Sequence, residues 1–127
     1  ILNVKIPHLN QWIKKRNEIG KQYISQIKNL KINTPIVNNS NFHAFHLFVI
    51  RCENRDDLIL HLKDNGIGYS IHYPTALPFL ACYSHLNYSF KDFPVASEYQ
   101  NKILSIPMFP ELKVNEIKKV IEVLNQF

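Results

Sequence analysis

The segment HAFHLFVIRC, residues 43–52, constrains the fold of this chain more than any other stretch. Its apolar side chains fall on both alternating faces of an extended chain, with Phe45, Leu47 and Val49 on one face and Phe48 and Ile50 on the other. A strand that is apolar on both faces is normally covered on both, so it lies inside a sheet. The segment therefore predicts a central strand, around which the other elements must be arranged.

A helix and a second strand are predicted directly after this strand. Asn54 and Asp57 have the spacing of an N-terminal capping box, which predicts a helix over residues 55–65. Gly66 suits the left-handed position at which such a helix ends. The next six residues, IGYSIH at 67–72, alternate apolar and polar positions, which predicts a strand with one face toward solvent or a site.

Three more helices are expected. Apolar residues recur at steps of three and four over residues 8–30, which predicts a long amphipathic helix. Gly20 lies inside it at a cost of about 1 kcal/mol relative to alanine, so we expect close packing there. After a loop at 31–41 and the strand–helix–strand unit, a helix is expected to begin near Asp92, as a cap, and to carry Ala96, Tyr99 and Ile103. The last helix, 113–126, is expected to bury Val114, Ile117, Val120, Ile121 and Leu124.

These elements predict one α+β domain, a small and partly antiparallel sheet covered by helices. The chain has 127 residues, which is near the commonest domain size. It contains no apolar run long enough for a membrane span and no signal-peptide pattern at its start. Because it begins in mid-pattern without Met, we interpret Ile1 as a cut end. We expect no membrane partner.

The charge and the cysteine content exclude few classes of function. The net charge of +5 could attract nucleic acid, but the excess is spread along the chain, and solvated helix faces account for it better. Cys52 and Cys82 have no metal-ligand spacing, so two buried free thiols in a reducing cytoplasm are expected. Aromatic residues on the 43–52 strand raise an RNA-binding alternative, but the interleaved glycines and the leading basic residue of RNA-recognition strands are missing. We therefore expect no nucleic-acid partner.

The stretch SIHYP, residues 70–74, is the best candidate for a binding site. His72 and Tyr73 supply hydrogen-bond donors at a strand end, where Pro74 fixes the exit path. From spacing alone the structural alternative is favoured, in which His72 satisfies a backbone carbonyl and Tyr73 belongs to the core. His43 and His46 would lie on opposite strand faces, so no metal site is predicted. No nucleophile or acid–base pair can be assembled, and no catalytic residue is assigned.

Several blocks resemble, in order, the DegT/DnrJ/EryC1/StrS aminotransferase family. The first helix carries the pattern R-x-x-I-x-x-x-Y at Arg16, Ile19 and Tyr23. Further on come HLFVIR, NRDDL, GIGYSIHYP, KDFPVAS and LSIPMFPEL. The resemblance runs from about residue 8 to the end. The chain departs from the family pattern at Ala76, Pro78, Cys82, Lys91 and Ser97.

The resemblance implies a C-terminal small domain of a fold-type-I enzyme dependent on pyridoxal phosphate. Residues 1–30 would form the helix linking the two domains, and 31–127 the α+β body. Such enzymes are homodimers that transfer an amino group from glutamate to a nucleotide-linked keto sugar, for lipopolysaccharide and related polysaccharides. His72 and Tyr73 would bind the nucleotide sugar.

The same resemblance implies that the large domain, with the cofactor's lysine, belongs to polypeptide outside this chain. We therefore expect no cofactor-binding residue in this chain, no pyridoxal phosphate bound to it, and no transamination by it alone. An exposed apolar patch is expected where the partner domain packs, around Trp12. A stand-alone protein-binding module remains as an alternative of another class.

Overall fold

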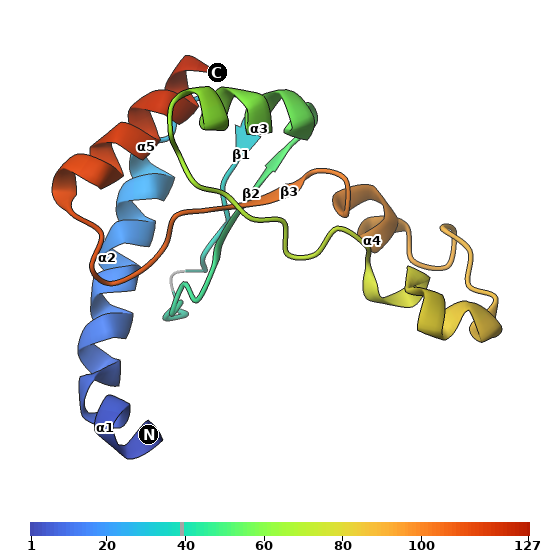
Figure 1. The fold of residues 1–127 in the computed structure, drawn as a ribbon, viewed down its shortest axis with the longest axis horizontal. Helices are drawn as coiled ribbons and strands as arrows, with labels where there is room; N and C mark the ends of the chain where they lie inside the picture. Colours follow the sequence, from blue (N-terminus) through green and yellow to red (C-terminus); the bar gives the residue numbers. More distant parts are fainter. Residues whose placement is uncertain (39) are drawn as a thin grey trace.

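The computed structural model describes residues 1–38 and 40–127. A three-stranded antiparallel sheet lies at its centre, in the order β1-β2-β3, formed by Ile32–Asn33, Phe48–Cys52 and Ile103–Ile106. The helices are α1 (Leu2–Lys5), α2 (Leu9–Gln26), α3 (Arg55–Asp64), α4 (Pro94–Tyr99) and α5 (Val114–Gln126), with 3₁₀ turns η1 (Ile6–His8), η2 (Leu77–Phe79) and η3 (Ala81–Leu86). The predicted α+β class is confirmed (Figure 1).

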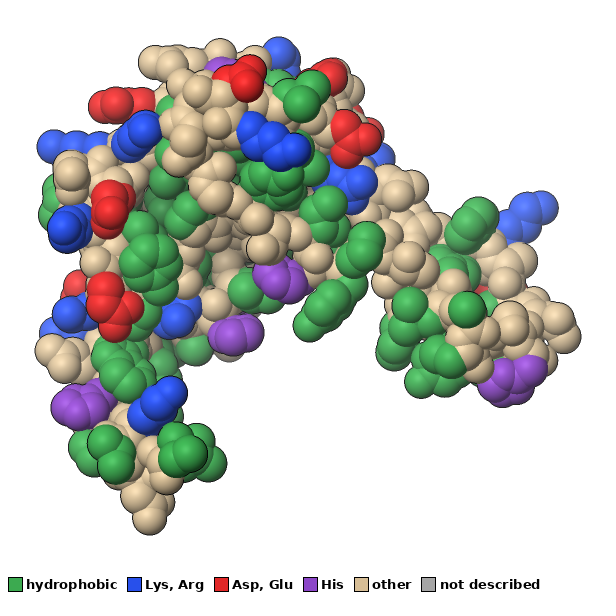
Figure 2. All heavy atoms as spheres, viewed as in Figure 1, with side chains coloured by type: hydrophobic (Ala, Val, Ile, Leu, Met, Phe, Trp, Pro, Cys, Tyr) green, Lys and Arg blue, Asp and Glu red, His purple; other side chains and the backbone are tan. Residues whose placement is uncertain are grey.

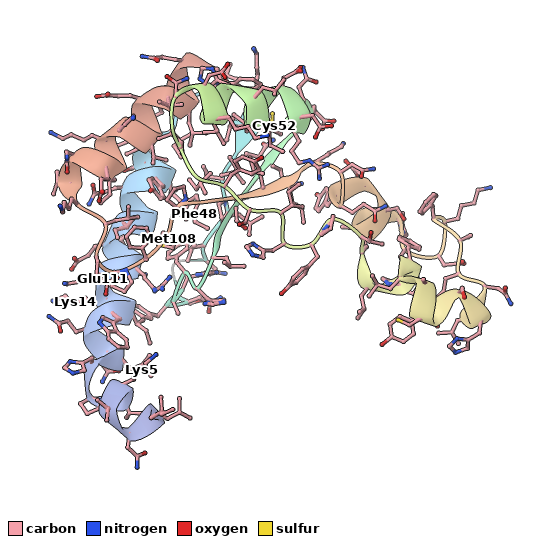
Figure 3. All side chains as sticks on the ribbon, viewed as in Figure 1. Lys5, Lys14, Phe48, Cys52, Met108 and Glu111 are labelled. Carbon is pink, nitrogen blue, oxygen red and sulfur yellow. The ribbon has the colours of Figure 1, made fainter. Side chains whose placement is uncertain are left out.

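One face of the sheet carries the hydrophobic core. Because β2 pairs with β3 in the register Phe48↔Ile106 and Ile50↔Leu104, these four side chains point to the same face, and all are buried. Helices α2, α3 and α5 bring their apolar stripes into this core. Phe48 and Cys52, labelled in Figure 3, lie on this inner face of β2.

The opposite face of the sheet is only partly covered. The expectation that 43–52 forms one strand with both faces covered is half right, because the strand is central but begins only at Phe48. Val49 and Arg51, on the second face, remain half-buried. Residues 43–47 are instead irregular, and Phe45 has a positive φ of 45°. This thinly covered face is where the candidate site lies.

The predicted helices differ from the observed ones mainly at their ends. Helix α2 ends at Gln26 rather than at residue 30, and Asn54 precedes α3 without a side-chain cap. Helix α4 begins at Pro94 after Phe93, while Ile103 belongs to β3. Gly66 has φ +67°, as predicted. Asn39, within the predicted loop 31–41, lies outside the described residues.

Two packing predictions were wrong. Val114 opens α5 and is 66% exposed, because the first turn of that helix extends past the core, whereas Ile117, Val120, Ile121 and Leu124 are buried. Cys52 is a buried free thiol as expected, but Cys82 is exposed. The reason is that Cys82 lies in η3, on a segment that projects away from the core.

Residues 75–99 form this projecting segment, which we call the arm (Figure 1). A small group of partly exposed rings in edge-to-face contact holds it together, in which Phe79 meets Phe90 at 4.8 Å and Tyr88 meets Phe93 at 4.9 Å between centroids. Figure 2 shows hydrophobic side chains on the arm and near the N-terminus, on either side of a hollow. The molecule therefore presents a concave side bounded by these two apolar projections.

Candidate functional site

The site begins with the segment that carries His72. The strand predicted over 67–72 is reduced to one antiparallel bridge, in which Ser70 and Ser105 exchange backbone hydrogen bonds of 3.0 and 2.7 Å. That bridge lies at the edge of β3 away from β2, so it extends the sheet by a single residue pair. Two residues later, the side chain of His72 reaches back over β3.

A hydrogen bond of 2.9 Å joins His72 Nδ1 to the Ser105 hydroxyl. Ser105 pairs with Val49 of β2, and so lies on the thinly covered face of the sheet. Its side chain is nevertheless buried, since residues 70–72 cover it. The structural alternative for His72 is therefore wrong in detail, because its partner is a side-chain hydroxyl rather than a backbone carbonyl.

Tyr73 lies on the surface. Its side chain is 71% exposed, and its ring meets the His72 ring edge to face, with the centroids 5.6 Å apart. The peptide bond between the two residues is cis. The structural alternative that placed Tyr73 in the core is wrong, and its phenol is available to a ligand.

A cleft of about 310 Å³ lies beside His72. Its walls come from the 67–72 segment, from the residues before β2 and from the chain leaving β3; they include Leu47, Gly68, Ser105, Met108 and Phe109. No charged side chain of the described residues lines it. It is a mainly apolar recess in which His72, Tyr69 and the two serines provide the polar side chains.

A second cleft, of about 440 Å³, adjoins the first at Phe109. Leu9, Trp12 and Ile13 of α2 line it, together with His46 and Glu111. Trp12 itself is half-buried, whereas Leu9 and Phe109 are exposed. The apolar side chains that precede α2 have larger exposed fractions than either. The expected apolar patch is thus present on the first helical segment, although it is centred nearer the N-terminus than Trp12.

Arg16 and Tyr23 fix the walls of both clefts to α2. The Arg16 guanidinium donates to the carbonyls of Phe45, His46 and Met108, at 3.2, 3.0 and 2.8 Å. Tyr23 is buried and donates its hydroxyl to the Pro107 carbonyl at 3.0 Å. Burial raises the pKa of the Tyr23 phenol, so it stays a neutral donor. Arg16 and Tyr23 of the R-x-x-I-x-x-x-Y pattern therefore bind the irregular backbone before β2 and after β3 to helix α2.

Two other histidines have structural partners. His43 Nδ1 accepts a hydrogen bond of 2.9 Å from the Phe45 amide, which supports the loop before β2. His61 Nε2 lies 2.9 Å from the Val123 carbonyl, between α3 and α5. Within the residues that the structure describes, no three His, Cys, Asp or Glu side chains are grouped to hold a metal ion.

Sequence reasoning missed Ser105. It was noted only as part of the LSIPMFP block. A signal was present, however, because a lone hydroxyl inside an otherwise apolar strand needs a partner when it is buried. Phe48, in contrast, removes the RNA-binding alternative, because its ring is fully buried and cannot stack on a base.

The comparisons agree with this architecture. The model of the DegT/DnrJ/EryC1/StrS aminotransferase family matches residues 1–125. The chain belongs to this family. No helix in the described ranges, 1–38 and 40–127, combines the length and apolarity that crossing a bilayer requires.

Two curated relatives from different bacteria cover nearly the whole chain. The erythromycin biosynthesis sensory transduction protein EryC1 of Saccharopolyspora erythraea is 37% identical over 98% of the chain. The dTDP-3-amino-3,6-dideoxy-alpha-D-galactopyranose transaminase of Aneurinibacillus thermoaerophilus is 30% identical over 100% of it. In each case the match covers 34% of the relative, so the chain spans about a third of the length of these proteins.

Solved structures of the family show the same fold. Streptomyces venezuelae DesV, crystallised in complex with a ketimine intermediate, superposes with a TM-score of 0.91 and 28% identity. A family aminotransferase from Brucella abortus superposes at 0.88 with 31% identity. The two matches cover 98% and 100% of this chain, but 34% of each of the other chains. This family architecture accounts for the chain better than a stand-alone binding module does.

Proposed function

We propose that this chain is the C-terminal small domain of a pyridoxal-phosphate-dependent aminotransferase. The complete enzyme transfers an amino group from glutamate to a keto-deoxysugar linked to a nucleotide. Relatives named as transaminases of dTDP- and UDP-linked sugars support this substrate class. We further propose that the enzyme is a cytoplasmic homodimer, that residues 1–30 link its domains, and that its product enters a cell-surface polysaccharide such as lipopolysaccharide.

The residues of this chain do not fit the covalent site of the cofactor. A lysine that forms a Schiff base is normally desolvated, with a lowered pKa that frees the amine. Eleven of the twelve lysines are exposed, Lys5 and Lys14 among them (Figure 3), and Lys102 is half-buried. Lys102 donates hydrogen bonds to the carboxylates of Glu53 and Glu98, and these bonds raise its pKa, which opposes that chemistry. We assign the attachment of pyridoxal phosphate, and its role as electron sink, to the large domain.

The task of this domain is then to bind and orient the nucleotide sugar. The single observation that carries this assignment is the position of His72, at the mouth of an apolar cleft and beside an exposed phenol. His72 and Tyr73 offer hydrogen bonds to phosphate or sugar oxygens, while the apolar walls exclude water from one side of the ligand. No charged side chain of the described residues lines the cleft, so we assign the cations that neutralise a diphosphate to parts of the enzyme outside this chain.

The test is steady-state kinetics of the complete protein with a nucleotide-linked keto sugar as the substrate. His72→Ala is expected to raise the KM for that sugar roughly tenfold, as for the loss of a hydrogen bond to a charged group. The protein should remain folded, with a melting temperature lowered only by the loss of the hydrogen bond to Ser105, and the KM for glutamate should be unchanged. His85→Ala, at an exposed histidine of the arm, is the matched control and should leave every constant unaltered. An unchanged sugar KM in His72→Ala would remove the proposed contact.

A further inference from the structure

Ser105 determines which atom of His72 faces the cleft. The two ring nitrogens of His72 have different surroundings: Nδ1 lies 2.9 Å from the Ser105 hydroxyl, whereas Nε2 has no hydrogen-bond partner among the described residues. Yet no buried side-chain nitrogen or oxygen in this part of the chain lacks a partner. It follows that Nε2 is not buried, and of the two ring nitrogens it is the one free to meet a ligand.

The direction of the hydrogen bond follows from the burial of Ser105. Its side chain is 4% exposed, and His72 Nδ1 is the sole partner of its hydroxyl within the described residues. If Nδ1 carried the proton, the hydroxyl hydrogen would be buried without an acceptor, which costs about 1–3 kcal/mol. If Nδ1 is the acceptor, both groups are satisfied and the proton of the neutral ring is on Nε2.

We infer that Ser105 is a positioning residue, whose hydroxyl donates to His72 Nδ1 and so holds an Nε2–H donor toward the ligand. The matching group on the ligand is an oxygen acceptor, such as a phosphate oxygen or the lone pair of a sugar hydroxyl. A protonated amine is excluded as the partner of this atom. The inference rests on the proposed function for the identity of the ligand, but not for the geometry of the pair.

The backbone around the pair limits its movement. Ser70 and Ser105 are joined by two backbone hydrogen bonds, and Ser105 is also in register with Val49. The backbone of Ser105 is therefore held by a neighbouring segment on each edge. The Ser105 hydroxyl in turn holds the His72 ring. Such support for a binding side chain is more precise than a loop residue provides alone.

The first test is NMR of the chain labelled with ¹⁵N, at a pH where His72 is neutral. Free imidazole itself favours the Nε2–H form, so the tautomer alone does not decide; the chemical shift of Nδ1 does. We expect Nδ1 to be unprotonated and displaced toward the shift of a hydrogen-bonded acceptor. Ser105→Ala should return it to the value of a free acceptor, and Ser105→Thr, which keeps a hydroxyl, should restore it.

The matched control is Ser70→Ala. Ser70 forms the same backbone bridge, but its side chain is exposed and makes no hydrogen bond to the described residues. Ser70→Ala should leave the chemical shift of His72 Nδ1 unchanged. The amide signals of residues 70 and 105 show in each variant whether the backbone bridge persists. A protonated Nδ1 in the unmodified chain, or an Nδ1 shift indifferent to Ser105→Ala while the bridge persists, overturns the inference.

The second test is kinetic and uses the complete protein. Ser105→Ala should raise the KM for the nucleotide sugar about two- to tenfold, as for one neutral hydrogen bond, with kcat little altered. In the double variant with His72→Ala, it should add nothing, because it acts only through His72. Additive effects would show that Ser105 acts independently. If His72→Ala has no effect on KM, the proposed contact between His72 and the sugar nucleotide fails, while the NMR result on the His72–Ser105 pair stands.

Discussion

Gly20 shows how one residue controls the packing of α2. A Cβ placed on Gly20 would lie 2.6 Å from two ring carbons of Phe45, a distance that requires the ring to move. The Phe45 ring is buried and stacked on Phe48, with centroids 5.5 Å apart, so it has little freedom to do so. The close packing expected at Gly20 is therefore confirmed, and its partner is the irregular segment before β2.

Gly20→Ala is expected to destabilise the protein. Overpacking of this kind costs about 1–3 kcal/mol, and the gain in helix propensity of about 1 kcal/mol offsets only part of it. The measurement is the free energy of unfolding from urea denaturation. Gly68→Ala is the matched control, because nothing lies within 4 Å of the added carbon. Equal stability of the two variants would show that Phe45 yields without cost.

At the residue scale, sequence reasoning succeeds where one residue type admits few environments. Gly66 follows from the left-handed backbone that ends α3. The partners of Arg16 and Ser105 could not be predicted, since they lie 29 to 92 positions away from Arg16 and 33 positions away from Ser105 along the chain. His72 was found because the sequence SIHYP is unusual, whereas Ser105 is a common residue in an ordinary strand.

Among the elements, the helices follow from periodicity, but the strands follow only in part. Segment 67–72 alternates as a strand should, yet it forms only a single bridge to Ser105, at the edge of β3 away from β2. Residues 43–47 are apolar enough for a strand, but they bend to place Phe45 against α2. Tertiary packing overrides local pattern in both segments.

The turn within the arm depends on Asp92. Its carboxylate accepts hydrogen bonds from the Ser89 amide and hydroxyl, at 2.7 and 2.8 Å. These bonds lower the pKa of Asp92 below its ordinary value of 3.8. Asp92 therefore does not cap α4 as predicted. It closes the turn that precedes this helix.

The order of this turn is expected to depend on pH. The pKa of Asp92 is lower in the folded protein than its ordinary value of 3.8. The carboxylate therefore stabilises the turn fully above pH 3.8, and this stabilisation is lost as the pH falls through the folded-state pKa. Amide NMR should show the Ser89 signal moving toward its unfolded position only below pH 3.8. In Asp92→Asn, which has no titrating carboxylate, that acid-dependent movement should disappear. A shift that begins at higher pH would assign the effect to another group.

At the scale of the whole molecule, apolar surface is concentrated at two ends. Leu2, Val4 and Ile6 are 73%, 75% and 60% exposed, and the arm exposes Leu77 and Phe90 at 66% and 63%. Contiguous surface of this kind is usually an interface. The resemblance predicted the patch near the N-terminus, but the arm was not predicted, because nothing local indicates that a segment leaves the core.

We expect the isolated chain to self-associate through its N-terminal surface. Sedimentation velocity should show a mass that rises with concentration above 14.9 kDa. The double substitution Val4→Lys and Leu9→Lys should suppress the association, since charges on this surface cannot be buried unpaired. Leu30→Lys is the control, because Leu30 is 99% exposed beyond the end of α2. Association that persists in the double variant would assign it to the arm.

The base of the arm is narrow and polar. The Ala76 amide donates to the Gln100 side chain, Arg55 donates to the Gln100 carbonyl, and the Arg51 guanidinium stacks on Tyr99. None of these contacts reaches the inner face of the sheet, and among the described residues none of 75–99 belongs to the buried core. A change in this segment therefore alters what meets its tip without removing a side chain from that core.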